Sequence, residues 1–159
     1  MLRATGAVIL GYIVIAAFIF ATFSLTYFLL GPSFAFEPGT TETSSQWMAV
    51  AMVLNVIAAA IGAWVTAAVA RERAKGAVFA LAILILVFGV VSALLAMNAP
   101  APVLPDRPLT TLEAAQYARQ PEWYPFLVAG IGSIAILATG ILILRRRAGG
   151  SADAPASAG

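Results

Sequence analysis

The sequence of 159 residues contains no cysteine and no histidine. The chain therefore has no disulfide and no thiol nucleophile, and it lacks the commonest ligands of zinc, copper and haem iron. Charged residues are also scarce, at 10% of the chain, whereas they make up about a quarter of an ordinary soluble domain. These absences predict a protein that has no cofactor, no metal site and no histidine or cysteine catalytic centre.

Apolar residues take the place of the missing charge, at 62% of the chain, and the mean hydropathy is +0.96. Four windows contain no Asp, Glu, Lys or Arg, and they run approximately over residues 7–30, 46–70, 77–97 and 124–144. Each window reaches the roughly 20 residues that a helix needs to cross a hydrocarbon core about 30 Å thick. Strands of a membrane barrel would be about ten residues long and would alternate in polarity. The sequence therefore predicts an all-α four-helix transmembrane bundle.

Basic residues are concentrated at one end of the predicted spans. That end carries Arg3, Arg71, Arg73, Lys75, Arg145, Arg146 and Arg147. The segments at the other end carry only Arg107 and Arg119. Because short loops rich in Lys and Arg resist translocation, we expect both termini to be cytoplasmic.

Two units are expected along the chain: a four-span membrane domain over residues 1–147 and a disordered cytoplasmic tail over residues 148–159, which has no large apolar residue. Arg greatly outnumbers Lys, and Ala and Gly are abundant, which is typical of bacterial chains from GC-rich genomes. We expect a multi-pass protein of a bacterial cytoplasmic membrane. An alternative for the first span is a cleaved signal peptide ending near Ser33 and Ala35. The apolar run of the first span is longer than the usual signal-peptide core of about 7–15 residues, which favours a retained span.

The longest polar interruption, residues 98–123, contains several prolines and then the stretch TTLEAAQYAR. Thr110 and Glu113 have the spacing of a capping box, and good helix formers follow them. We therefore expect a short extracytoplasmic helix over Thr110–Arg119, between the third and fourth spans. In the other outer segment, Thr43 and Gln46 are expected to cap the second span. The candidates for an outer-face interaction are Phe34, Phe36, Glu37, Asp106, Arg107, Glu113 and Arg119.

Within the predicted spans, Asn55 is the strongest polar group. It shares a helix face with four smaller residues at positions i+3, i+4, i+7 and i+11. These residues are Ala58, Ala59, Gly62 and Thr66. Because small residues allow helices to approach closely and an amide in lipid seeks a hydrogen-bond partner, we interpret this face as a helix-packing face. Contact of Asn55 with a substrate, a lipid or a second subunit is the alternative.

No ionisable residue lies inside the spans, which argues against an ion-coupled carrier. The leading hypothesis is a non-enzymatic accessory or assembly protein that lies in the lipid bilayer and packs with a membrane-protein partner or with itself. The alternative is a passive or weakly coupled small-molecule carrier or a lipid-binding protein. A membrane enzyme that uses outer carboxylates is a further alternative, with Glu37, Glu42, Asp106, Glu113 and Glu122 as the candidates. No basic face suited to nucleic acid is present.

Overall fold

The computed structural model describes residues 2–38, 40–98 and 118–152. Its elements are α1 (Leu2–Leu30), α2 (Pro32–Ala35), α3 (Ser45–Ala70), the 3-10 helix η1 (Arg71–Arg73), α4 (Ala74–Met97) and α6 (Trp123–Ala152). The described ranges contain isolated β-bridges but no strand, so the all-α prediction is confirmed. Three helical segments within these described ranges are long and apolar enough to cross a membrane: Leu2–Leu30, Ser45–Met97 and Trp123–Arg147. The chain is therefore a membrane protein by the length and composition of its helices.

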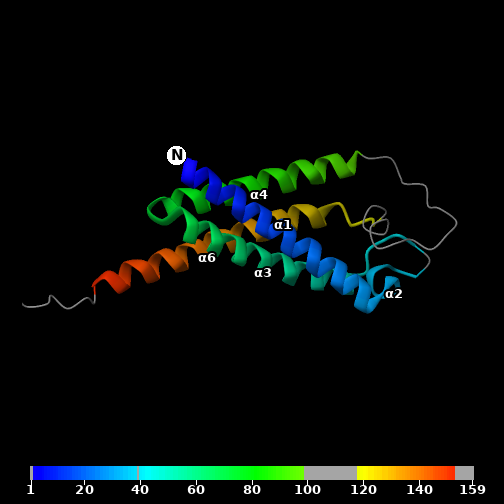
Figure 1. Ribbon diagram of the computed structural model, residues 1–159. Helices are drawn as coiled ribbons and strands as arrows, with labels where there is room; N and C mark the ends of the chain where they lie inside the picture. Colours follow the sequence, from blue (N-terminus) through cyan, green and yellow to red (C-terminus); the bar gives the residue numbers. More distant parts are fainter. Residues whose placement is uncertain (1, 39, 99–117, 153–159) are drawn as a thin grey trace, which may run out of the picture.

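The long helices lie side by side, and η1 reverses the chain between α3 and α4 (Figure 1). Helix α3 contacts α1, α4 and α6, and α4 contacts α6. The start of α1, the turn at η1 and the last part of α6 gather at one end, which we call the basic end. Helix α2 and the start of α6 lie at the opposite end, which we call the loop end.

Helices α1 and α3 pack closely near the basic end, where Gly11 of α1 lies against Gly62 of α3. A Cβ atom on Gly62 would overlap the side chain of Ile15 and would lie 3.1 Å from the carbonyl oxygen of Gly11. A Cβ on Gly11 would overlap the hydroxyl of Thr66, which donates a hydrogen bond of 3.3 Å to the carbonyl of Ala7. The absence of side chains at both glycines therefore sets the distance between the two helices.

Helices α4 and α6 use the same kind of packing. Cβ atoms added at Gly89 and Gly140 would overlap Ala129 and Val78, respectively. The hydroxyl of Ser133 lies 2.8 Å from the carbonyl oxygen of Ala129, within its own helix. These small side chains allow close contact without large interdigitating groups.

The α3–α4 turn is stabilised by arginines from the two other long helices. Arg71 has a φ of 51°, which is uncommon for a residue other than glycine, and it redirects the chain as α3 ends. The guanidinium of Arg3 donates to the carbonyl of Val69 at 3.1 Å, and that of Arg147 donates to the carbonyl of Ala67 at 3.2 Å. Both carbonyls belong to the last turn of α3, where a helix leaves its C=O groups without internal partners.

At the loop end, the structure corrects the expected cap of α3. The N-cap is Ser44, not Thr43, and its hydroxyl oxygen accepts a hydrogen bond of 3.0 Å from the Trp47 amide. The same hydroxyl donates to the carbonyl of Phe34 in α2. Ser44 therefore ties the short helix to the start of α3.

The predicted extracytoplasmic helix falls mainly on residues 110–117, which lie outside the described residues. Its last two residues, Ala118 and Arg119, are not helical. Arg119 instead forms a parallel bridge with Glu42, and its backbone amide donates a hydrogen bond of 2.8 Å to the carbonyl of Thr41. Backbone pairing with the first outer segment requires an extended conformation, so it competes with a helical end at these positions.

The helices also extend beyond the predicted spans. Helix α1 begins at Leu2 rather than near residue 7, and α6 continues to Ala152, into the segment expected to be a disordered tail. Residues 153–159 of that segment lie outside the described residues. Hydropathy finds the part of a helix that suits lipid, whereas a helix continues through its polar ends while the backbone hydrogen bonds are satisfied.

Candidate ligand-binding cavity

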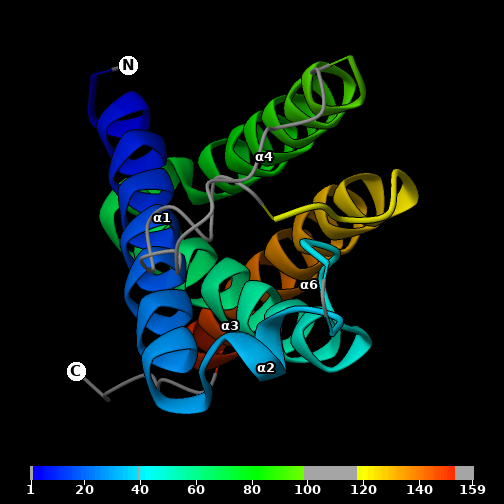
Figure 2. The same ribbon diagram turned by 90° about the vertical axis from the view of Figure 1, so that its right-hand side faces the viewer.

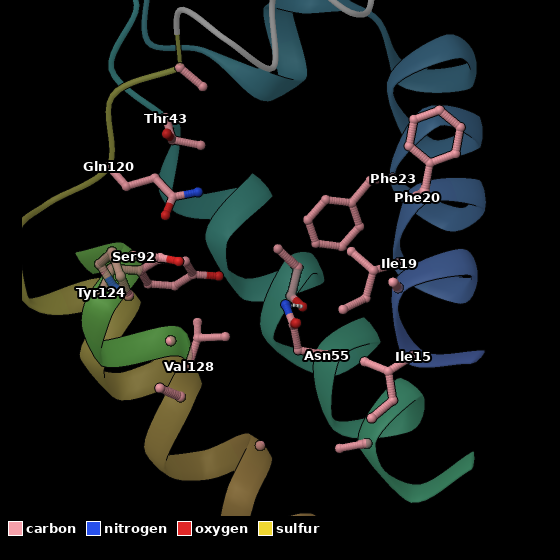
Figure 3. Close-up of a pocket in the computed structure, with 18 of the residues that line it drawn as sticks. Ile15, Ile19, Phe20, Phe23, Thr43, Asn55, Ser92, Gln120, Tyr124 and Val128 are labelled. Carbon is pink, nitrogen blue, oxygen red and sulfur yellow. Dashed lines mark hydrogen bonds between the residues drawn. The ribbon is translucent and has the colours of Figure 1, made fainter. Parts of the chain in front are cut away.

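A cavity of about 970 Å³ lies within the bundle, between the middle of the helices and the loop end. All four long helices contribute to its walls. Figure 3 shows Ile19 and Phe23 of α1 on one side, Ser92 and Val128 of α4 and α6 on the other, and Asn55 of α3 between them. Its volume is at the upper end of the range of about 300–1,000 Å³ that is usual for small-molecule sites.

The cavity exists because α1 and α4 approach each other closely only toward the basic end, where Leu81 of α4 lies near Gly11 of α1. The buried residues of α1 are Ala7, Gly11 and Ile15, and no residue between Ile15 and the end of α1 is buried. The buried residues of α4 are similarly concentrated before residue 83, with Ala93 as the exception. Toward the loop end, α1 therefore keeps only α3 as a close partner, through Phe23 and Trp47, and α4 keeps only α6, through Gly89 and Ala129.

Helices α1 and α4 meet at the rings of Tyr12 and Phe88, whose centroids are 5.9 Å apart. Beyond this contact the two helices diverge toward the loop end (Figure 2). Residues of the cavity wall occur on both diverging segments, for example Ala16 and Phe20 on α1 and Ser92 on α4. In a bilayer this opening would face the hydrocarbon region, because both helices are apolar and long enough to span it.

Aromatic side chains form the wall near the loop end. Trp47 is central: its ring lies edge-on to those of Phe23, Tyr27 and Phe34, with centroid distances of 5.7, 6.4 and 6.5 Å. The ring of Phe36 in turn lies edge-on to Tyr27 at 6.3 Å. Edge-to-face contacts of this type add roughly 0.5–1.5 kcal/mol each beyond the burial of area, so these five residues stabilise one another, and all of them except Phe34 line the cavity. We call them the aromatic cluster.

Asn55 provides an amide on the α3 wall. Its Nδ2 donates a hydrogen bond of 2.8 Å to the carbonyl of Ala51, one turn earlier in the same helix (Figure 3). The side chain is half-buried and lines the cavity, and no hydrogen bond joins its Oδ1 to the part of the chain that the structure describes. That oxygen and the second N–H are therefore available to a bound molecule.

Two serine hydroxyls also line the cavity. Neither Ser24 nor Ser92 has a hydrogen bond to any described residue, although a serine in a helix can donate to the carbonyl one turn earlier. Two other polar groups of the wall are already paired: the Tyr124 hydroxyl donates to the carbonyl of Met48 at 2.9 Å, and the Thr43 hydroxyl donates to that of Arg119 at 2.7 Å. The Gln120 amide and the hydroxyls of Tyr12 and Tyr27 also line the cavity without a hydrogen bond to a described residue, and none of these groups carries a charge.

The described wall of the cavity contains no Asp, Glu, Lys or Arg. Among residues 2–38, 40–98 and 118–152, no group of three or more acidic residues is placed to hold a metal ion. Serine without an adjacent base is a poor nucleophile, and an amide neither gives nor takes a proton near neutral pH. The described wall therefore suits binding of an apolar or amphipathic molecule rather than acid–base chemistry.

The structure divides the predicted packing face into two parts. Ala58, Ala59, Gly62 and Thr66 are buried between helices, and Ala59 also borders the cavity, whereas Asn55 is half-buried and faces the cavity. The helical spacing places all five on one face, but Asn55 is nearest the loop end, where α1 and α4 have separated.

The candidates for an outer-face interaction have different surroundings. Phe34 and Phe36 belong to the aromatic cluster, and Glu37 is exposed. Arg119 is exposed and pairs with the first outer segment through its backbone. Asp106, Arg107 and Glu113 lie outside the described residues.

Sequence reasoning missed the contribution of α1 and α4 to the cavity. Ser24 and Ser92 were visible only as small residues in apolar spans, and Phe23 and Tyr27 as members of an apolar helix. The i, i+4 spacing of Phe23 and Tyr27 places them on one face. No local signal shows that this face borders a cavity in addition to contacting Trp47 of α3.

Comparisons with protein-family models, with curated protein sequences and with solved structures find no match. A functional proposal must therefore be built on the geometry of the cavity.

Proposed function

We propose that this chain is a four-span membrane protein that binds a lipid-like amphiphile in the cavity between its helices. The count of four treats α3 and α4 as two separate spans. Each of these helices, of 26 and 24 residues, is longer than the roughly 20 residues needed to cross the hydrocarbon core. The concentration of basic residues at one end supports cytoplasmic placement of both termini.

The observation that carries this proposal is the cavity of about 970 Å³ on a chain whose surrounding solvent is lipid. An empty apolar space of this size inside a bundle would forfeit the van der Waals contacts of every wall residue, and a hydrocarbon chain restores them. Access from the bilayer between α1 and α4 requires no passage through water. A molecule that already resides in the membrane is thus the best-suited ligand.

A binding role fits the wall better than an enzymatic one, because no Asp, Glu, Lys or Arg is among the described residues of the wall. The described carboxylates at the loop end, Glu37, Glu42 and Glu122, are all exposed, and none of them lines the cavity. We accordingly propose a non-enzymatic protein that uses no cofactor.

The second candidate function is assembly with another membrane protein or with a second copy. The opening between α1 and α4 is bordered by the small residues Ala16, Gly89 and Ser92, and small residues favour helix–helix approach. A partner helix could occupy the opening in place of a lipid. The two functions differ in what fills the same space, so one pair of variants distinguishes them.

Trp47 is a suitable reporter, because it lines the cavity while Trp64 and Trp123 are exposed at 61% and 58%. We would replace these two with Phe, reconstitute the protein in nanodiscs containing phosphatidylcholine with brominated acyl chains, and measure quenching of Trp47. Ala16→Phe adds a ring to the cavity wall, whereas Ala17→Phe adds the same ring at an exposed position outside the wall.

If lipid chains occupy the cavity, quenching of Trp47 is reduced by Ala16→Phe and unchanged by Ala17→Phe. Equal quenching in the two variants would contradict a lipid in the cavity. If, in that case, Ala16→Phe alone converts an oligomer to a monomer, the assembly function is favoured instead.

A further inference from the structure

We infer that the ligand is an amphiphile with an uncharged, hydrogen-bonding head, of the monoacylglycerol or long-chain alcohol type, whose head contacts Asn55 and whose chain lies toward the middle of the bundle. This inference rests on the proposed function and specifies the chemical class of ligand. It depends on how polar and apolar groups are distributed along the cavity.

The part of the cavity toward the middle of the bundle is apolar. Its walls there include Ile15, Ala59, Ile85 and Ile136, of which Ile15, Ala59 and Ile136 are buried. None of these side chains can form a hydrogen bond. A hydrocarbon chain is the matching occupant of this part, because it gains dispersion contacts and leaves no polar group unpaired.

Most polar side chains of the wall lie closer to the loop end than this apolar part, and several of them, including Gln120, have unused hydrogen-bonding capacity. Asn55 offers an acceptor and a donor from α3, Ser24 a hydroxyl from α1, and Ser92 a hydroxyl from α4. Hydroxyl and ester groups of a ligand can pair with such neutral donors and acceptors. The ligand head therefore belongs at this level, between the apolar part and the aromatic cluster.

The head is inferred to be uncharged because the described wall offers no opposite charge. An ionised phosphate or carboxylate in this apolar space would lose its hydration without gaining a Lys or Arg partner, and an unpaired buried charge is strongly unfavourable. Arg119, the described basic residue nearest in sequence to the wall residues Ala118 and Gln120, is exposed and does not line the cavity. A neutral head avoids this cost.

The test uses two probes with the same brominated acyl chain: a monoacylglycerol and the corresponding lysophosphatidate, which differ by one phosphate. Each is titrated into nanodiscs holding the protein with Trp47 as its single tryptophan. A version with Trp123 as its single tryptophan reports the probe concentration in the surrounding bilayer, because Trp123 is exposed at the loop end and does not line the cavity.

We expect half-maximal quenching of Trp47 by the monoacylglycerol at a bilayer concentration at least about tenfold below that of the lysophosphatidate. Asn55→Leu should raise the monoacylglycerol concentration needed by roughly three- to tenfold, the effect of losing one hydrogen bond. Val56→Leu, at a neighbouring position outside the wall, should not change it. The comparison of the two probes on the unchanged protein requires no variant to fold.

The inference would be overturned if the two probes quenched Trp47 equally or if the lysophosphatidate quenched it more strongly. It would also be overturned if Asn55→Leu did not change the monoacylglycerol concentration needed for half-maximal quenching. If one of these outcomes is found and Ala16→Phe still prevents both probes from quenching Trp47, the cavity binds amphiphiles and only the inferred ligand class is wrong. If Ala16→Phe blocks neither, the proposed function fails as well.

Discussion

Gly11 and Gly62 show how single residues determine the shape of the bundle. Each lies where the neighbouring helix would overlap a Cβ atom. Ala at either position must push α1 away from α3 or displace the side chains of Ile15 and Thr66. Enlarging a residue in a well-packed site typically costs about 1–3 kcal/mol. Gly62→Ala is therefore expected to lower the thermal stability of the purified protein in detergent by an amount in this range.

The matched control for Gly62→Ala is Gly6→Ala, in α1. No atom lies within 4 Å of the position that a Cβ would occupy on Gly6. Because alanine is preferred over glycine in a helix by about 0.8–1.0 kcal/mol, this substitution should leave stability unchanged or raise it slightly. Equal melting temperatures for Gly62→Ala and Gly6→Ala would show that the close crossing of α1 and α3 is not required for stability.

Asn55 illustrates which properties of a site residue the sequence reveals. Its amide and its helical spacing from Ala58 and Gly62 predict a special face of α3. Spacing defines a direction around one helix axis, but it does not give the distance to the neighbouring helices at each level. That distance depends on residues remote in sequence, such as Gly11 on α1, which lies against Gly62 and Thr66 of α3. Whether Asn55 meets a helix or a cavity could not be predicted from α3 alone.

Among the elements, the C-terminus of α3 depends most directly on other helices. Its last-turn carbonyls of Ala67 and Val69 accept hydrogen bonds from Arg147 and Arg3. A cation at a helix C-terminus also interacts favourably with the helix dipole, typically by about 0.3–1 kcal/mol. The double variant Arg3→Gln/Arg147→Gln should therefore melt at a lower temperature in detergent, by an amount that corresponds to about 1–2 kcal/mol in total.

The control is Arg145→Gln/Arg146→Gln, which removes the same charge from the same end of the molecule. Both residues are exposed, and neither has a hydrogen bond to a described residue. This variant should retain the melting temperature of the unchanged protein. If Arg145→Gln/Arg146→Gln lowered the melting temperature as much as Arg3→Gln/Arg147→Gln does, stability would depend on the total positive charge and not on the contacts with α3.

Elements with strong local signals were predicted closely from the sequence. Helix α3 was expected over residues 46–70 and runs over Ser45–Ala70, because a polar segment precedes it and Arg71 follows it. The loop end was predicted less well. Ser44 was overlooked as the cap, and the pairing of Glu42 with Arg119 joins residues far apart in sequence. Such pairing has no local signature, so Thr110–Arg119 was expected to be helical throughout.

At the scale of the whole molecule, small residues pack the helices together toward the basic end and leave a cavity toward the loop end. This asymmetry explains why an amphiphile can bind without unfolding the bundle: Gly11, Gly62 and Gly140 do not themselves line the cavity, although Ile15, which packs on Gly62, does. Because of the same asymmetry, the orientation of the chain in the membrane determines which half of the bilayer the cavity opens to. If the basic end is cytoplasmic, the cavity draws its ligand from the outer half of the bilayer.

This placement can be tested cleanly because the chain has no cysteine of its own. We would introduce single cysteines at three exposed positions: Thr40→Cys and Glu122→Cys at the loop end, and Glu72→Cys in η1 at the basic end. A membrane-impermeant maleimide added to intact cells should label the cysteines at positions 40 and 122 and leave the one at position 72 unlabelled. Permeabilising the cells should make all three equally reactive.

This labelling pattern would require both α3 and α4 to cross the membrane, because the chain must reach η1 on the inside and return. Labelling of all three positions in intact cells would contradict two crossings by Ser45–Met97, and with them the four-span proposal. Labelling of position 72 alone would keep the four crossings and reverse the orientation. The cavity would then open to the cytoplasmic half of the bilayer, although the seven basic residues of the basic end make that orientation unfavourable.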